Sequence, residues 1–358
     1  MSLQTDVARD VASEVASVRQ RVALTECEHV VGLRLSGPSV FEIVDAICPC
    51  ELYLQDGQML HTLLLDETAC PVADAYVCAD GQDFVLITEG LSPDELRAYL
   101  RQCAPAGLAL DIRDLGQSQR PVSLNGPYAW ELLSAVLSAE VIGLPYLGFY
   151  HGSGFTCFRA GKTGEYGYDL WLDRSGDDGL LERLLNVGGE YGLGRAGLSA
   201  LDACSLENWV FNMRREGRAR LSPIELQLQW RLSYRKAFPG SARLGELRRA
   251  GPRRRAVLVA SEHELSQGDV LCFAGEPVGE VVLGERSPTR GDVLGIAVLA
   301  MPHAHPGVGS LEVARSGAST RVISAPAVNN RSLYVDPQRH SYGTRSEHVF
   351  PPIWSTGA

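Results

Sequence analysis

Two stretches of the chain repeat one plan of strand, Gly-Pro break and helix. The first copy covers residues 31–47 with its break at 37–38, and the second covers residues 121–136 with its break at 126–127. In both copies a short apolar run precedes the break, and a run with helical spacing follows it. Proline is favoured in the first turn of a helix. A repeated unit of this kind indicates a pseudo-duplicated α+β architecture rather than one wound sheet.

The two ends of the chain differ from this pattern. Valines at spacings of three and four predict an amphipathic helix over residues 5–21. From about residue 255 onward, short apolar runs alternate with Gly, Pro, Asp and Ser turns, which is typical of a small β-barrel or sandwich. After about residue 326 the composition is polar and has no clear period, so we expect an extended tail.

Residues 154–173 predict a strand, a tight glycine turn and a second strand. Glycines recur every third position from 161 to 167, and apolar and polar residues alternate from Tyr168 to Asp173. The tripeptide at 161–163, Gly-Lys-Thr, matches the end of a phosphate-binding loop. That motif also needs a glycine at position 156, which is threonine, and a helix afterwards, where a strand pattern follows. The sequence therefore does not support nucleoside triphosphate binding.

Charge and cysteine content limit the partners of the chain. With 43 acidic and 33 basic residues the net charge is −10, which argues against nucleic acid as the main partner. No apolar run is long enough to span a membrane. The nine cysteines form no Cys-x-x-Cys pair and no leader is recognised, so we expect reduced thiols, a cytoplasmic location and no metal site.

Lysine is rare in this chain. The only lysines are Lys162, inside the glycine turn, and Lys236, while the other basic residues are arginines. An ammonium kept at position 162 is consistent with a need for a compact point charge, or with chance survival of a surface lysine.

Five motifs follow one another in an order that resembles the glycine-cleavage T-protein (aminomethyltransferase) family. The central motif, Arg159-Ala-Gly-Lys-Thr-Gly-Glu-Tyr-Gly-Tyr-Asp169, is similar to the family's Arg-Thr-Gly-Tyr-Thr-Gly-Glu-Asp-Gly-Phe-Glu. The other four motifs are residues 197–207, 222–230 and 279–289, and the pair of Gly-Pro units. The Cys-containing motif of the related iron–sulfur-assembly branch is missing at residues 235–242, which argues against that branch.

The resemblance extends from about residue 14 to about residue 335 and implies a fold. The family forms a three-lobed ring, in which two α+β lobes and a C-terminal β-barrel surround a channel for tetrahydrofolate. On this basis we expect a first α+β lobe from residues 1–50 and 120–225, and a second from 51–119 and 226–250. We expect the barrel at 251–335 and the extended tail at 336–358.

Two carboxylates take functional roles if the resemblance is carried over. Asp74 stands at the place of the family's catalytic aspartate, the second acid of a pair whose first is here Ala73. It would position a folate nitrogen, stabilise an iminium or move a proton, and we expect burial to raise its pKa. Asp169 stands at the place of the pterin-binding glutamate, where it would accept two hydrogen bonds. Without the resemblance, both would read as solvated acids.

Five further positions are candidates for the same site. Lys162 replaces a family tyrosine and is a candidate for both catalysis and cofactor binding. His61 also replaces a tyrosine and is either catalytic or a bystander. Thr88, in place of an asparagine, and Tyr168 are candidate cofactor contacts, and Trp230 is either a stacking platform or part of the barrel packing.

The helix at 197–207 has lost two arginines of the family motif. Leu201 and Ser205 stand in their places, whereas Asp202 and Glu207 are kept. Loss of the charge at 201 should weaken contact with the acidic tail of folate by ~1–3 kcal/mol if that contact is buried.

These observations predict a folate-dependent one-carbon transferase. The cofactor would be tetrahydrofolate or its 5,10-methylene or 5-methyl form, and the second substrate a small molecule of a specialised pathway rather than the glycine-cleavage carrier. Two alternatives stay open: a non-catalytic folate-binding regulator, and a folate-free enzyme in which Lys162 is the base or amine nucleophile.

Overall fold

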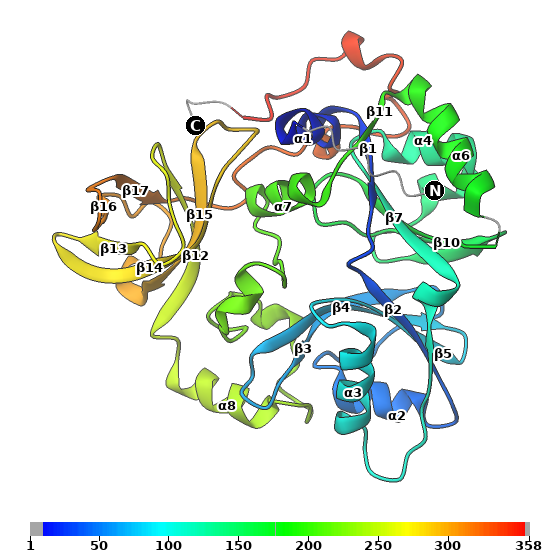
Figure 1. Cartoon of the computed structure of the whole chain (residues 1–358), viewed down its shortest axis with the longest axis horizontal. Helices are drawn as coiled ribbons and strands as arrows, with labels where there is room; N and C mark the ends of the chain where they lie inside the picture. The colour runs from blue at the N-terminus through cyan, green and yellow to red at the C-terminus, as the bar shows by residue number, and fades with distance from the viewer. Residues whose placement is uncertain (1–9, 176, 355–358) are drawn as a thin grey trace.

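The computed structural model describes residues 10–175 and 177–354. It confirms the predicted α+β fold: two sheets with helices and a closed six-stranded barrel form three lobes around a centre (Figure 1). The predicted N-terminal helix is present as α1, Val11–Gln20, and residues 5–9 of that prediction lie outside the described residues.

The first sheet has six strands in the order β11-β1-β7-β10-β9-β8. The β1–β11 pair is parallel, and the other pairs are antiparallel. The predicted strand–turn–strand at 154–173 forms β9 and β10 of this sheet. The strands are β1 Val22–Glu26, β7 Gln119–Asn125, β8 Phe149–Gly152, β9 Phe155–Phe158, β10 Gly167–Asp173 and β11 Leu193–Arg195.

The second sheet has five antiparallel strands in the order β3-β4-β5-β2-β6. Strand β4 is buried along almost all of its length, because helices cover one face and the first sheet covers part of the other. The strands are β2 Val31–Ser36, β3 Met59–Leu65, β4 Pro71–Asp80, β5 Asp83–Glu89 and β6 Asp111–Asp114.

The barrel closes in the order β12-β15-β14-β13-β16-β17, with β17 returning to β12. It is the all-β region that the sequence predicts after residue 255. The strands are β12 Arg254–Ser261, β13 Val270–Phe273, β14 Glu276–Arg286, β15 Val293–Ala300, β16 Leu311–Val313 and β17 Ser319–Val322.

Eight α-helices lie among the described residues and cover the outer faces of the two sheets or join the lobes. Helices α4 and α6 lie beside the first sheet and α2 and α3 beside the second (Figure 1). Besides α1, the helices are α2 Val40–Ile47, α3 Pro93–Cys103, α4 Ala129–Val136, α5 Glu140–Gly143, α6 Asp177–Gly188, α7 Leu198–Glu207 and α8 Ser241–Ala250. Short 3-10 turns are η1 Leu115–Gln117, η2 Gly189–Tyr191, η3 Glu216–Ala219, η4 Gln229–Arg231, η5 Met301–His303, η6 Arg331–Leu333 and η7 Arg345–Glu347.

The inner faces of the two sheets pack against each other. Trp171 of β10 is buried among apolar side chains of the second sheet, including Tyr76 and Ile87. Its ring lies so close to Gly32 of β2 that a Cβ there would come within 2.3 Å of the indole. Close approach of this kind requires glycine. The sheet-to-sheet contact therefore brings the ends of β4, β5, β7 and β10 together near the centre of the molecule.

The repeated strand–break–helix units occupy one sheet each. β7 and α4 belong to the first sheet, whereas β2 pairs with β5 and β6 and α2 packs in the core of the second. The grouping of residues 31–50 with 120–225 is therefore wrong, because the chain crosses between the sheets after β1. The duplication places one copy on each side of the central interface.

The C-terminal segment packs back across the first lobe (Figure 1). The backbone N–H of Tyr342 donates to Oε2 of Glu131 at 2.6 Å, and the Oη of Tyr166 donates to the carbonyl of Val335 at 2.9 Å. Residues 331–347 include two 3-10 turns, η6 and η7, so the tail is a packed segment with local structure.

Candidate functional site

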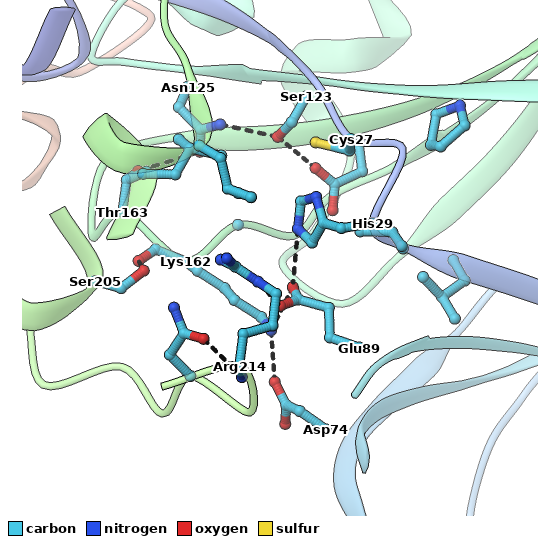
Figure 2. A pocket seen from close by; sticks show the side chains of 18 of the residues that line it. Cys27, His29, Asp74, Glu89, Ser123, Asn125, Lys162, Thr163, Ser205 and Arg214 are labelled. Carbon is cyan, nitrogen blue, oxygen red and sulfur yellow. Dashed lines mark hydrogen bonds and ion pairs between the residues drawn. The ribbon is translucent and has the colours of Figure 1, made fainter. Parts of the chain in front are cut away.

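A cavity lies between the two sheets and is closed at one side by α7 and the glycine turn. The space between its walls is about 750 Å³, including the open mouth. Much of its lining is apolar, whereas charged side chains gather on one wall (Figure 2). The apolar members are Val30, Ile87, Pro121, Val122, Trp171, Leu198 and Leu201.

Lys162 is the cation at the middle of this charged wall (Figure 2). Its Nζ lies 2.7 Å from Oδ2 of Asp74 and 2.7 Å from Oε1 of Glu89. Burial alone would lower the pKa of Lys162, but the two carboxylates raise it. Both contacts favour the charged ammonium, which argues against the alternative in which Lys162 is a base or an amine nucleophile.

Asp74 is almost fully buried in β4, and cations or donors contact both of its oxygens. Its Oδ1 lies 2.9 Å from Nη1 of Arg231 and 2.8 Å from Nε2 of His61, and its Oδ2 contacts Lys162. Burial would raise the pKa of Asp74, but these three neighbours hold it well below the usual range. The expected rise in pKa is wrong, because the sequence did not reveal the two cations beside this carboxylate.

His61 lies on the neighbouring strand β3, directly opposite Tyr76 of β4. The two rings stack with centroids 4.3 Å apart. Burial lowers the pKa of His61, and the nearby carboxylate of Asp74 opposes this shift. His61 does not line the cavity itself, and it acts on the site through Asp74.

Glu89 extends the charged wall towards α7. Its Oε2 lies 3.6 Å from Nε of Arg214, which also pairs with Asp202 of α7, and its Oε1 lies 3.8 Å from Nε2 of His29. Burial would raise the pKa of Glu89, but Lys162 lowers it below the usual value. The wall therefore consists of alternating carboxylates and cations, each carboxylate contacting at least one cation.

Asp169 lies in another part of the lining, on β10 of the first sheet. Its Oδ1 accepts a hydrogen bond of 2.5 Å from Oγ of Ser123, which in turn accepts from Nδ2 of Asn125 at 2.8 Å. Burial raises the pKa of Asp169 to about 6, against the opposing effects of Ser123 and Lys162. One carboxylate oxygen is thus held by the protein while the group faces the cavity.

Two hydroxyl groups of the second sheet are buried at the cavity without a partner. Oγ1 of Thr88 and Oη of Tyr76 have no hydrogen bond within the described part of the chain, and both residues line the cavity. A buried hydroxyl without a partner costs free energy, so such groups are usually satisfied by a ligand or by water. Thr88 therefore lies where the sequence analysis expected it.

Two predicted contacts lie elsewhere. Tyr168 faces away from the cavity, because neighbouring residues of a strand point to opposite faces and Asp169 faces inward. Its ring packs in the helix-covered core, 4.5 Å from the guanidinium of Arg159. Trp230 is 67% exposed on the turn η4. The next residue of the same turn, Arg231, is buried. Both assignments as cofactor contacts are wrong.

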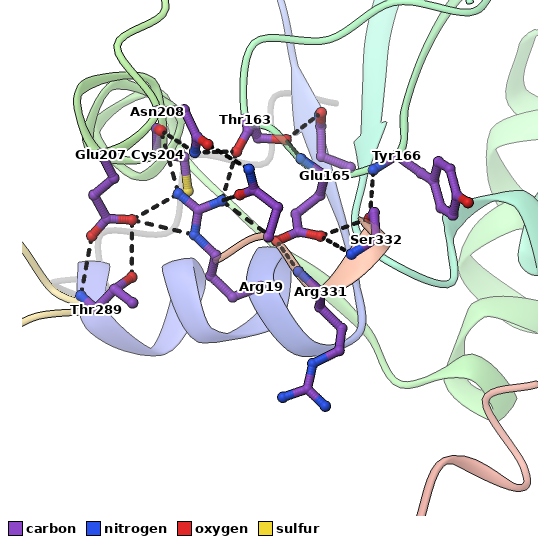
Figure 3. Close-up of polar contacts among 12 residues, drawn as sticks. Arg19, Thr163, Glu165, Tyr166, Cys204, Glu207, Asn208, Thr289, Arg331 and Ser332 are labelled. Atoms are coloured by element: carbon purple, nitrogen blue, oxygen red, sulfur yellow. Dashed lines mark hydrogen bonds and ion pairs between the residues drawn. The ribbon is translucent and has the colours of Figure 1, made fainter. Parts of the chain in front are cut away.

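A second buried cation stands behind the glycine turn (Figure 3). Arg19 of α1 donates to Oε2 of Glu207 from Nε and Nη2, and to the carbonyl of Thr163 at 2.6 Å. Its two other N–H groups donate to the carbonyl of Cys204 and to Oδ1 of Asn330. All five donors of the guanidinium are thus used.

This cluster ties distant segments to the glycine turn. Glu207 also accepts from Ser287 and Thr289 of the barrel lobe, at 2.6 Å and 2.9 Å. Glu165 accepts from the backbone and hydroxyl of Ser332 in the C-terminal segment, at 2.8 Å and 2.6 Å. The turn that carries Lys162 is therefore fixed by α1, the barrel and the tail together, and Gly164 (φ +80°) supplies the left-handed residue it needs.

Several site residues were missed by the sequence analysis. Ser123 and Asn125 alternate with Val122 and Leu124 in β7, a pattern that could have indicated a polar face. Arg214 and Arg231 lie in irregular segments with no period, so nothing in the sequence marked them. Glu89 is the last residue of β5, and nothing in the sequence marked it as functional.

Comparison with known proteins agrees with this arrangement. The family model described as "GCVT N-terminal domain" matches residues 4–236, and the chain therefore belongs to this aminomethyltransferase family. Aminomethyltransferases of Thermotoga neapolitana and Mycobacterium bovis are 22% and 29% identical, over 81% and 80% of this chain and 82% and 80% of theirs. A crystal structure of the glycine cleavage system aminomethyltransferase T from Bartonella henselae superposes with a TM-score of 0.79, at 22% identity and 90% coverage of each chain.

Two other kinds of feature are absent from the described residues. No helix among them is long and apolar enough to cross a membrane. Within the same residues, no group of three or more His, Cys, Asp or Glu side chains is arranged to hold a metal ion.

Proposed function

We propose that the chain is a tetrahydrofolate-dependent one-carbon transferase that acts on a small molecule. The observation that carries the proposal is Asp169. Its carboxylate faces the cavity, with one oxygen held by Ser123, in the position that the family resemblance predicts for an anchor of the pterin ring. Family membership over residues 4–236 supports the same cofactor.

The cavity has the chemistry that a pterin requires. A pterin is a flat ring with an amino group and a ring N–H that can donate to one carboxylate, as Asp169 offers. Trp171 and Ile87 supply apolar surface for the faces of the ring, and the unpartnered hydroxyls of Thr88 and Tyr76 supply further polar contacts. When bound, the folate would supply the nitrogen that carries the one-carbon unit.

The protein's own residues would bind and orient this ligand. Asn125 donates a hydrogen bond to Ser123, and Ser123 donates one to Asp169. Asp169, oriented in this way, would bind the pterin ring. Asp74 remains ionised, so its role is to hold Lys162 and to place a negative charge in the site rather than to donate a proton. Leu201 lines the cavity where the family motif has an arginine, so any contact to the acidic tail of folate there is lost.

Isothermal titration with tetrahydrofolate and 5,10-methylenetetrahydrofolate tests the proposal. We expect wild type to bind, and Asp169→Asn to bind at least tenfold more weakly because one charge-assisted contact is lost. Asp173→Asn is the matched control, since Asp173 lies on the same strand outside this cavity and pairs with Gln119. No binding of either folate to wild type would contradict the proposal.

One observation favours a second candidate, a non-catalytic folate-binding protein. The aspartate in the catalytic position contacts Arg231, His61 and Lys162, so none of its oxygens is free of a protein contact. To separate the candidates, the protein would be incubated with 5,10-methylenetetrahydrofolate carrying ¹³C in the methylene group and with a metabolite extract. Transfer of ¹³C to a small molecule, detected by mass spectrometry and reduced in Asp74→Asn, supports the transferase. Folate binding without transfer supports the non-catalytic protein.

A further inference from the structure

The ammonium of Lys162 has more donors than the protein uses. An ammonium has three N–H donors. Two carboxylate oxygens contact it at 2.7 Å: Oε1 of Glu89, which accepts a hydrogen bond, and Oδ2 of Asp74, which forms an ion pair. No third acceptor contacts Nζ within residues 10–175 and 177–354. Lys162 lines the cavity with 18% of its side chain exposed, so the remaining donor is available to a molecule bound there.

The carboxylates on this wall are already neutralised by protein cations. Asp74 contacts Arg231 as well as Lys162, and Glu89 contacts Arg214 as well as Lys162. A ligand that brings a cationic amine would have to displace one of these cations, and it would lie beside the ammonium in a site of reduced dielectric. A ligand that brings an anionic acceptor completes the coordination of Lys162 and displaces nothing.

We infer that Lys162 is a specificity-determining residue, and that the second substrate is an anion whose acceptor oxygen or sulfur contacts the Lys162 ammonium. Molecules that present a cationic amine at this wall are excluded. The inference rests on the proposed function in one respect: folate fills the part of the cavity at Asp169, and the anion takes the part at Lys162. Arg214 also lines the cavity, but Asp202 and Glu89 pair with it, so the inference rests on Lys162.

The inference is tested with two probes of similar size and opposite charge, benzoate and benzylammonium. Each is titrated into the tetrahydrofolate-loaded protein, with binding followed by ligand-observed NMR. We expect wild type to bind benzoate at least tenfold more tightly than benzylammonium. In Lys162→Met, Asp74 and Glu89 lose a cation, so we expect the preference to disappear or to reverse. A purely structural role for Lys162 would weaken both probes alike.

Lys236→Met is the matched control, because Lys236 is the other lysine of the chain and pairs with Asp45 away from the cavity. It should keep the wild-type preference. If Lys162→Met does not fold, Lys162→Gln replaces it, and the thermal midpoint of each variant is measured beside the titrations. Equal or tighter binding of benzylammonium by wild type overturns the inference, as does binding of neither probe or an unchanged preference in the position-162 variant.

Failure of the inference and failure of the proposed function give different results. If tetrahydrofolate does not bind, the proposed function fails, and the charge preference can still be measured on the folate-free protein. If tetrahydrofolate binds and the preference for benzoate is absent, only the inference fails.

Discussion

Two buried cations lie on either side of one glycine turn, and they differ in how completely the protein satisfies them. Arg19 uses all five of its donors on protein acceptors and is 1% exposed. Lys162 donates one side-chain hydrogen bond, to Glu89, forms an ion pair with Asp74 and faces the cavity. Each cation contacts two carboxylates, so charge alone does not distinguish them. The fraction of N–H donors that hydrogen-bond to the protein does distinguish the two cations. It separates the structural cluster at Arg19 from the functional one at Lys162.

The difference also explains the choice of cation. A guanidinium has five donors in a planar fork and can join several segments at once, as Arg19 does for α1, α7, the turn and the tail. An ammonium is a compact point charge that two carboxylates can hold while a donor is left for a ligand. In a chain whose basic residues are nearly all arginine, a lysine at 162 fits this second task.

The largest effect should come from breaking the saturated cluster. Arg19→Met leaves Glu207 and Glu165 buried without their cation, which should cost about 3–5 kcal/mol of stability. Lys162→Met should cost less, because Arg231 and Arg214 still contact Asp74 and Glu89. Chemical denaturation of the variants measures the difference.

Arg21→Met is a control for that comparison, since Arg21 is partly exposed at the end of α1 and donates to Oγ of Ser17. Arg19→Lys should fall between wild type and Arg19→Met, because it keeps the charge and loses the fork. An equal loss of stability in Arg19→Met and Lys162→Met would contradict the distinction between the clusters.

The second effect concerns Asp169, whose burial works against stability. Its pKa is raised from 3.8 to about 6 in the folded protein, so folding disfavours the ionised form. By linkage, this cost grows as the pH rises from about 4 to about 6 and is complete above that range. Asp169→Asn should therefore stabilise the protein by at most about 3 kcal/mol at pH 8 and by almost nothing at pH 4.

Denaturation of wild type and Asp169→Asn at pH 8, 6 and 4 measures this dependence, with Asp173→Asn beside them. Functional sites often lower the stability of the folded protein, so a destabilising carboxylate in the cavity fits a ligand-binding role. If Asp169→Asn is less stable than wild type at pH 8, the carboxylate is not desolvated as described.

The third effect is the pH dependence of folate binding. The ionised Asp169 accepts the hydrogen bonds of the pterin, and the protonated form has lost an acceptor. Affinity should be constant well above pH 6 and fall by about tenfold per pH unit well below it. Titration calorimetry between pH 5 and pH 8 measures the profile, and Asp169→Asn should give a weak and nearly flat one. A wild-type profile that is flat across pH 6 would remove Asp169 from the site.

The smallest effect concerns the contact between the tail and the turn. Ser332→Ala removes one of the donors to Glu165, which should cost about 1 kcal/mol and increase hydrogen exchange in residues 326–354. Ser341→Ala is the control, because its hydroxyl bonds within the tail to Thr344. Folate affinity should be unchanged in both, since neither residue lines the cavity. Loss of folate binding in Ser332→Ala alone would mean that the tail positions the site directly.

The fold could be predicted from local patterns and family motifs, whereas the electrostatics of the site could not. Apolar alternation in β10 and the turn pattern after residue 255 specified their strands because they depend on neighbouring residues only. The pKa of Asp74 depends on Arg231, which is 157 positions away in sequence. The same limit applies to residues 31–50, whose lobe depends on which distant strand β2 pairs with.

The direct test of the central claim is a crystal structure of the protein with tetrahydrofolate. We expect the pterin in the cavity between the sheets, with its amino group and ring N–H donating to the carboxylate of Asp169. We also expect Lys162 still to contact Asp74 and Glu89, with its third donor directed towards the ligand-binding space. A pterin bound outside this cavity, or one that does not contact Asp169, would contradict the account.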